Sequence, residues 1–449
     1  MHSYLHGHPS LIQAVRKLEQ LAPDQFELYF MRKTATKIEA KNQAIDSLTR
    51  SEDVGISIRL IKDRRLGFSF TTSLEPSAID RAVDDAFSIA SVMPEDEFLT
   101  LHSFSTSVYQ NVEVVDSKAL TQPVEGKLKL ALELEARCRA ADRRVTGVRS
   151  ASLGETAFEM RMVDSHGEHL EHQSTLYTAS ITCKAEQDGD NQMGGEFGFS
   201  NFLDQLDIPA VGKQAAEYAT ELLGAGTAPT MQCPAIFRNN VVTELLEFLS
   251  SSFSSEEVDK GRSMLAGKEG TRVFSEQVSL INDGLLPGGL ATSPFDGEGI
   301  PSTKIALVEG GFLNAFLYDL YYAKKMGKTP SGCSSRSIKG PPSISTANFY
   351  MPNGKKSLPQ LMDGVSKGIM ITDLMGVHTA NSVTGDFSLG ASGILIENGK
   401  LTRPVRGFAV AGNVLDVFRK ISDIGNDMRF FGTVGAPSVR LTDISVSGS

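Results

Sequence analysis

The sequence predicts an α+β protein with two domains, over residues 1–226 and 227–449. A chain of 449 residues is too long for one ordinary hydrophobic core. In the first half, segments of alternating apolar and polar residues are interleaved with segments whose apolar residues recur every three or four positions. The second half consists mainly of alternating segments joined by Gly and Asn turns. Helices on an antiparallel sheet, followed by a mostly β domain, account for both patterns.

The composition argues against several classes of protein. The formal net charge is -10, whereas binding to a nucleic-acid backbone depends on clustered Lys and Arg. No run reaches the roughly 18 apolar residues of a membrane span, and the first residues lack the order of a signal peptide. The four cysteines are far apart with no CxxC pair, which offers neither a disulfide framework nor a zinc ribbon. We therefore expect a cytoplasmic protein that contacts neither membranes nor nucleic acid directly.

The elements of the first half follow from these periodicities in chain order. Helices are expected at 9–23, 75–92, 123–145 and 208–225, where apolar residues share one face. Strands are expected at 25–33 and in two hairpins, 54–72 and 155–186. The first hairpin turns at the polar stretch KDRR, and the second turns at Ser165-His166-Gly167, where Gly167 can supply a positive φ.

The second hairpin carries three histidines within seven positions, His166, His169 and His172. Such spacing would bring them together only on a helix, because in a strand His169 and His172 point to opposite faces. We therefore favour a solvated hairpin tip over a metal site.

A stretch rich in Gly, Thr and Pro at 224–234 separates the halves, which puts the boundary near Thr227. Beyond it, strands are expected at 303–311, 392–401, 406–412 and 438–448. One clear helix is expected at 239–263. Its apolar side comprises Val242, Leu245, Leu246, Leu249 and Phe253. An ordinary core helix explains this pattern. The serine run on its other side would need a distant histidine, such as His378 or those of the hairpin, to form a nucleophile.

Three further stretches carry candidate polar residues. Asp296 and Glu298 in PFDGEG, and Asp386 in TGDFS, are possible acid–base groups, but the adjacent glycines favour turns in which carboxylates cap backbone N–H groups. His378 stands alone, which favours a structural or pocket-lining role. Arg336 lies in the polar stretch 331–343 and either contacts a peptide carboxylate or is solvated; we favour solvated.

The motifs PFDGEG, TGDFSLGASG, IENG, AGN and IGND occur in this order in the second half. Together with residues 38–72 and the hairpin VDSHGEHLE, they make the chain resemble the TldD/PmbA family over nearly its whole length. The ordered set is far more specific than any one motif.

The resemblance implies one of two kinds of subunit. TldD-like members carry an HExxxH helix that binds zinc together with a C-terminal cysteine, and its glutamate is the general base of peptide hydrolysis. PmbA-like (TldE) members lack these ligands. Counting back from DKGRS, Leu246 falls at the first histidine, Glu247 at the glutamate and Ser251 at the second histidine. No cysteine follows Cys333. Neither Leu nor Ser at these positions is a normal zinc ligand, so no metal site is expected in this chain.

The resemblance therefore implies a non-catalytic PmbA/TldE-like subunit that pairs with a TldD-like subunit, in which the zinc is expected. Such pairs enclose a channel that admits unstructured peptides, and Arg336, His378 and Asp386 are channel candidates; His378 lies in a segment similar to a family loop near the subunit interface. A lone chain can form a homodimer instead. Two alternatives are a self-sufficient metal-dependent hydrolase, centred on the histidine hairpin, and a regulator of DNA gyrase that acts through protein contacts.

Overall fold

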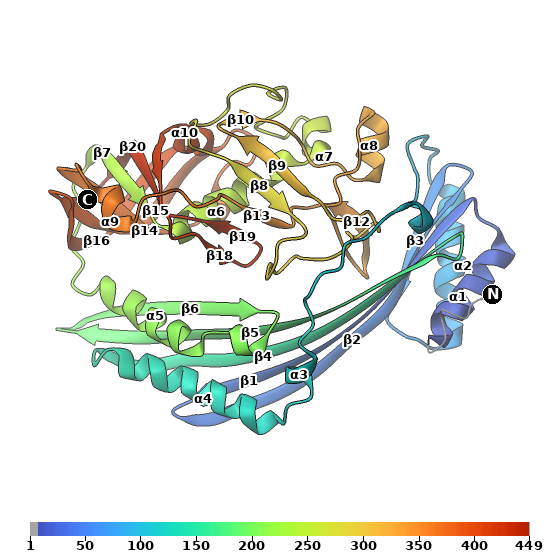
Figure 1. The fold of residues 1–449 in the computed structure, drawn as a ribbon, viewed down its shortest axis with the longest axis horizontal. Helices are drawn as coiled ribbons and strands as arrows, with labels where there is room; N and C mark the ends of the chain where they lie inside the picture. Colours follow the sequence, from blue (N-terminus) through green and yellow to red (C-terminus); the bar gives the residue numbers. More distant parts are fainter. Residues whose placement is uncertain (1–7, 449) are drawn as a thin grey trace.

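A computed structural model describes residues 8–448 (Figure 1). The N-terminal half, up to residue 223, contains one antiparallel sheet in the order β3-β2-β1-β4-β5-β6. Four of its strands have 17 to 20 residues, and the sheet curves beneath the C-terminal half (Figure 1). Its strands are β1 (Gln25–Lys41), β2 (Ala44–Lys62), β3 (Arg65–Thr71), β4 (Val145–Asp164), β5 (His169–Gln187) and β6 (Asp190–Ser200).

The two faces of this sheet have different neighbours because side chains alternate along a strand. The side chains of Phe26, Leu28 and Phe30 pack against helices on the outer face, whereas Tyr29 packs with Phe295 of the C-terminal half. Two helix pairs cover the outer face, α1 and α2 toward one end and α4 and α5 toward the other (Figure 1). The helices of this half are α1 (Pro9–Leu21), α2 (Pro76–Val92), α3 (Ser117–Leu120), α4 (Val124–Ala141) and α5 (Ile208–Glu221), with 3-10 turns at Phe104–Thr106 and Leu203–Gln205.

The C-terminal half, from residue 231, is built on two six-stranded sheets. One has the order β10-β9-β8-β13-β19-β18; the other has the order β16-β15-β14-β7-β20-β17, and β16 also pairs with β20, which closes part of that sheet into a ring. Their strands are β7 (Met231–Phe237), β8 (Leu280–Asp283), β9 (Lys304–Glu309), β10 (Phe312–Leu313), β13 (Asn348–Tyr350), β14 (Lys367–Met375), β15 (Asp386–Glu397), β16 (Lys400–Asn413), β17 (Ile421–Ile424), β18 (Arg429–Phe431), β19 (Val434–Ala436) and β20 (Val439–Ser447).

Short elements complete this half. A separate hairpin comprises β11 (Ser334–Ser337) and β12 (Gly340–Ile344). The helices are α6 (Asn239–Ser250), α7 (Ser255–Asp259), α8 (Leu320–Met326), α9 (Leu358–Met362) and α10 (Val414–Arg419), with 3-10 turns at Ser251–Phe253 and Val377–Thr379. Helix α6 contacts strands of both large sheets, and its apolar side belongs to the largest hydrophobic core.

The α+β class expected from the sequence is confirmed, with helices and hairpins close to the expected positions. The expected single helix over 239–263 is broken. Helix α6 ends at Ser250, a 3-10 turn follows, and Ser254 is extended before α7. The break is stabilised by the Ser255 N–H, which donates to the carbonyl of Leu317 (3.0 Å). Serine favours such a break because its hydroxyl competes for backbone groups, as Ser250 does at the carbonyl of Glu247 (2.6 Å).

The strand expected at 25–33 extends to Lys41 and pairs with β2 over its whole length. This extension pairs with the part of β2 before Val54, which the sequence also did not predict. That part of β2 is largely exposed and shows no clear alternation of apolar and polar residues. In the part of the chain described, no helix is long and apolar enough to cross a membrane.

Candidate functional site

Helix α6 holds the positions at which the resemblance aligns the HExxxH motif. Leu246 is fully buried in the core, whereas Glu247 is exposed and Ser251 is exposed at the start of the following 3-10 turn. Leu246 and Ser251 therefore face different surroundings, and neither offers a zinc ligand. Among residues 8–448, no group of three or more His, Cys, Asp and Glu side chains is arranged to hold a metal ion. The residues of this helix do not fit the zinc that the family resemblance implies for TldD-like subunits.

The three hairpin histidines diverge as the strand geometry predicts. His166 is exposed at the turn, with its Nδ1 3.8 Å from a carboxylate oxygen of Asp164. His172 points toward the C-terminal half, where its ring meets Phe295 edge-on at 6.3 Å, and burial lowers the pKa of His172 to about 4. His169 has its Nε2 4.0 Å from a carboxylate oxygen of Glu171, which is on the same face.

The PFDGEG segment forms a turn around a buried carboxylate. The side chain of Asp296 accepts hydrogen bonds from the backbone N–H groups of Glu298 (2.8 Å), Ile300 (3.0 Å) and Ser334 (2.9 Å). This is the capping role that the neighbouring glycines predicted. Burial, and then the charge of Glu298, raise the pKa of Asp296 to about 7, while these hydrogen bonds oppose the rise.

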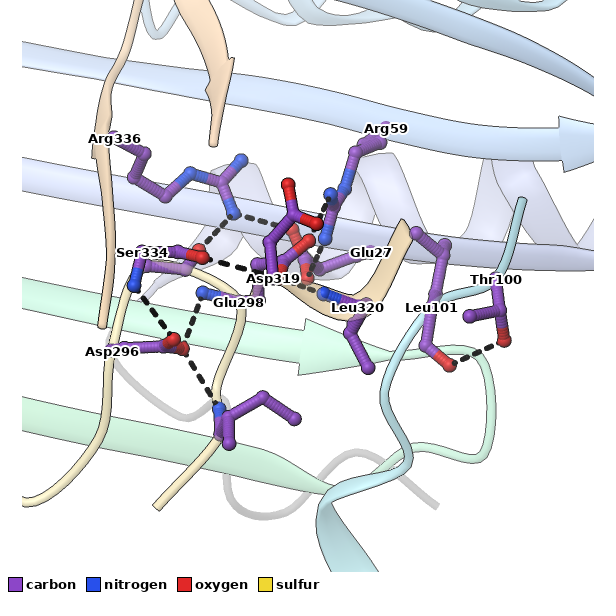
Figure 2. Close-up of polar contacts among 12 residues, drawn as sticks. Glu27, Arg59, Thr100, Leu101, Asp296, Glu298, Asp319, Leu320, Ser334 and Arg336 are labelled. Carbon is purple, nitrogen blue, oxygen red and sulfur yellow. Dashed lines mark hydrogen bonds and ion pairs between the residues drawn. The ribbon is translucent and has the colours of Figure 1, made fainter. Parts of the chain in front are cut away.

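A buried ionic cluster joins the two halves next to this turn (Figure 2). The guanidinium of Arg59 donates to Glu27 (3.0 Å) and to Glu298 (3.1 Å), and Arg336 also pairs with Glu27. All four side chains are at most 7% exposed. Burial by itself would raise the pKa of Glu27, but the charges and hydrogen bonds of the two arginines lower it below its ordinary value. The two arginines therefore keep Glu27 ionised although it is buried.

Arg336 is a substrate-channel candidate, and the expectation that it is solvated is wrong. Its side chain is 2% exposed and donates to the carbonyl of Gly297 (3.1 Å) and the hydroxyl of Ser57 (3.1 Å). Its guanidinium carbon lies 4.3 Å from the centre of the Tyr29 ring. The polar stretch around Arg336 is the hairpin β11–β12, which packs on the sheet of the N-terminal half.

A cavity of about 330 Å³ lies beside the cluster, between the N-terminal sheet and loops of the C-terminal half. Its lining includes His172, Phe295, Asp296, Cys333 and Arg336. The lining is mostly apolar, and Asp296 and Arg336 are its acidic and basic members. The thiol of Cys333 is buried, and burial, together with nearby carboxylates, raises its pKa.

The other two channel candidates lie apart from this cavity. His378 is exposed in the 3-10 turn after β14. Asp386 is exposed at the start of β15 and accepts hydrogen bonds from Asn413 Nδ2 (2.9 Å) and Thr384 Oγ1 (2.8 Å). These hydrogen bonds lower the pKa of Asp386, so it acts as a turn carboxylate.

Sequence reasoning missed Glu27 and Arg59, which hold the cluster together. Each interrupts an apolar strand at the alternate position, Glu27 between Phe26 and Leu28 and Arg59 between Ile58 and Leu60. A charged residue there looks solvent-facing in the sequence, because alternation does not reveal that a second layer covers the other face.

Three domain models of one metallopeptidase family match the chain. They are PmbA/TldA metallopeptidase domain 1 over residues 26–90, the central domain over 117–223, and the C-terminal domain over 230–448. Metalloprotease PmbA of Escherichia coli O157:H7 is 25% identical over 434 residues, which cover 95% of this chain and 92% of that protein. A Metalloprotease TldD homolog of Haemophilus influenzae is 26% identical over 428 residues, with coverages of 88% and 87%. A crystal structure from Thermotoga maritima, named for a proposed role as a modulator of a DNA gyrase, superposes with a TM-score of 0.88 at 27% identity and covers 98% of this chain and 99% of its own.

Proposed function

The chain belongs to the PmbA/TldD metallopeptidase family, and from that premise we propose that it is a non-catalytic subunit of the PmbA (TldE) type. In this proposal it pairs with a TldD-like subunit that carries the HExxxH helix and the zinc. The pair hydrolyses unstructured peptides in the cytoplasm, and this chain contributes binding surface rather than the reacting groups.

One observation carries the proposal. At the motif positions of α6, Leu246 is sealed in the core and Ser251 follows the end of the helix, so the exposed Glu247 has no metal-bound water to deprotonate. A catalytic zinc needs about three protein ligands and an open position for water. Restoring such a site would require repacking the core around Leu246.

Peptidase assays test the proposal. The full chain alone should leave a fluorogenic unstructured peptide intact, and adding an HExxxH-bearing homologue from the same organism should give hydrolysis. The matched control is the same mixture in which the partner's HExxxH glutamate is replaced by glutamine. Hydrolysis by this chain alone, or equal hydrolysis by the partner with and without it, would contradict the proposal.

Zinc content gives an independent test. After exposure to zinc and desalting, elemental analysis should find almost no zinc in this chain, whereas light scattering should find a heterodimer in the mixture and either monomer or homodimer in the lone sample. About one tightly held zinc per chain would instead favour a self-sufficient hydrolase. In that case alanine at His169 and His172 should abolish activity, although the two side chains lie on opposite faces of β5.

The name of the Thermotoga maritima relative raises regulation of a DNA gyrase as a further candidate. The net charge of -10 disfavours direct contact with DNA, so this role would have to act through protein contacts. A supercoiling assay with gyrase, with and without this chain, separates it from the peptidase role.

A further inference from the structure

A second cavity, of about 480 Å³, lies between the two halves, beside Asn240 and Glu244 in the first part of α6. It is bordered by β5, β6 and α5 on one side and by α6, β14 and Phe431 of β18 on the other. Its lining includes four carboxylates, Glu196, Glu221, Glu244 and Asp373.

Two of these carboxylates are neutralised by arginines. Glu221 binds Arg238 through two hydrogen bonds (2.9 and 2.7 Å), and Glu196 binds Arg429 in the same way (2.7 and 2.6 Å). These bidentate pairs fix the positions of both arginines and use their charge. Glu196, Glu221 and Arg238 of these pairs line the cavity.

The other two carboxylates have no such partner. Among residues 8–448, the side-chain carboxylate of neither Glu244 nor Asp373 forms a hydrogen bond or an ion pair. Four carboxylates facing two guanidiniums leave a charge of -2 when all are ionised. A wall with this excess negative charge attracts a cation.

Neutral oxygen atoms in the wall also lack partners. Thr372 is 3% exposed, and its hydroxyl oxygen is buried without a hydrogen bond; the side-chain oxygen of Asn240 is in the same state, although its amide donates to the carbonyl of Thr372 (3.0 Å). Thr372 lines the cavity together with its neighbour Asp373 because a β-bulge in β14 interrupts the alternation there. Buried oxygens without partners are uncommon, and both of these can accept a hydrogen bond from a bound group.

The pKa values of Glu244 and Asp373 are both raised in this environment. Burial, and then the charges of Asp373 and Glu247, raise the pKa of Glu244 to about 7. Burial also raises the pKa of Asp373, with Glu221 adding to the rise and Arg238 opposing it. A cation in the cavity would reverse both shifts.

We propose that this cavity binds a positively charged side chain, lysine or arginine, of a peptide. The inference rests on the proposed function for the presence of a peptide. A bare metal ion fits poorly, because the volume is large and the described residues include no group of three metal ligands. The rings of Phe197, Tyr218 and Phe431 line the cavity and suit the apolar stem of such a side chain, as well as its charge.

Peptide binding to the full chain, without any partner subunit, tests the inference by fluorescence anisotropy. The probes are acetylated Gly/Ser heptapeptides with a C-terminal dye and a central lysine, arginine or norleucine. At pH 8 we expect the lysine and arginine peptides to bind about ten-fold more tightly than the norleucine peptide, the effect of one charge-assisted contact. At pH 6 the preference should shrink, because Glu244 is then mostly protonated.

Two variants locate the effect. Glu244→Gln with Asp373→Asn should abolish the preference for a charged side chain, whereas Glu276→Gln, which removes an exposed carboxylate elsewhere, should keep it. Circular dichroism checks that the variants fold. Equal binding of all three peptides, no binding at about 1 mM, or a preference that survives in the double variant would each overturn the inference.

A further arm separates two sources of positive charge. The added probe is the norleucine peptide with a free N-terminus. If this peptide binds more tightly than its acetylated form, while the acetylated lysine and arginine peptides do not, the cavity takes a terminal ammonium group. That result would overturn the assignment to a side chain. Because binding is measured on the lone chain, a negative result leaves activation of a TldD-like partner to be judged separately. Conversely, failure to activate such a partner does not change the binding result.

Discussion

Replacing Arg59 with methionine should destabilise the protein strongly, because Arg59 is the only guanidinium that contacts both Glu27 and Glu298 in the buried cluster of the described chain. Methionine keeps much of the side chain's length but removes two charge-assisted hydrogen bonds, each of which contributes about 1.5–3 kcal/mol. The variant leaves Glu298 buried without a cation, whereas Glu27 keeps Arg336. Breaking a buried pair in this way costs about 3–5 kcal/mol.

The matched control is Arg64→Met. Arg64 forms an ion pair with Glu95 at 2.7 Å, but its side chain is 66% exposed, so its loss should cost less than about 1 kcal/mol. A second comparison is Arg59→Met combined with Glu298→Gln. Neutralising the stranded carboxylate should recover about 1–3 kcal/mol.

Urea unfolding followed by far-ultraviolet circular dichroism measures these differences, since the chain contains no tryptophan. Hydrogen exchange shows where the Arg59→Met variant is destabilised. Faster exchange is expected in β11–β12 and in the turn around Asp296, because Arg59 is linked to this turn through Glu298. If Arg59→Met lost no more stability than Arg64→Met, or if the double variant were no more stable than the single one, the cluster would not join the two halves as we infer.

Three other perturbations have defined outcomes. The pKa of Glu244 is about 7 in the fold against 4.5 when unperturbed, so between these pH values the folded state holds a proton that the unfolded state has released, and stability falls as pH rises through that window. Urea titrations at pH 5 and pH 8 should show no such fall for Glu244→Gln, a difference of about 1–2 kcal/mol after allowance for solvent screening. Gly194→Ala would put a Cβ 2.2 Å from a backbone nitrogen of α5 and should lower the melting temperature at a cost of about 1–3 kcal/mol, whereas Gly147→Ala, with no atom within 4 Å, should be nearly neutral. Ellman's reagent should react with the thiols only after unfolding, since all four are buried; rapid reaction of the native protein would contradict this packing. These are Cys138, Cys183, Cys233 and Cys333.

Much of the architecture follows from local patterns. Helix α2 was predictable because Ile79, Val83 and Ala86 recur on one face after Pro76 near its start. The turn of the β2–β3 hairpin was predictable from its polar residues, and Asp63 and Arg64 adopt the positive φ values that tight hairpins use. Local periodicity does not reveal where an element stops when its end is set by a distant contact, as at Ser254 beside Leu317.

For the candidate site, the sequence by itself determined which side chains are present and which are not. No histidine occurs in 239–263, and no fold can supply a ligand that the helix lacks. Alternation along β5 likewise separated His169 from His172.

Only the tertiary structure decided which charges meet. Glu27 and Arg336 are 309 residues apart, Arg59 and Glu298 are 239 apart, and the carboxylates of the second cavity come from both halves of the chain. The physical reason is that periodicity assigns a side chain to a face of its element, whereas its partner and its solvation depend on which layer covers that face. From the sequence alone Arg336 is expected to be a solvated loop residue, but in the fold the N-terminal sheet covers it.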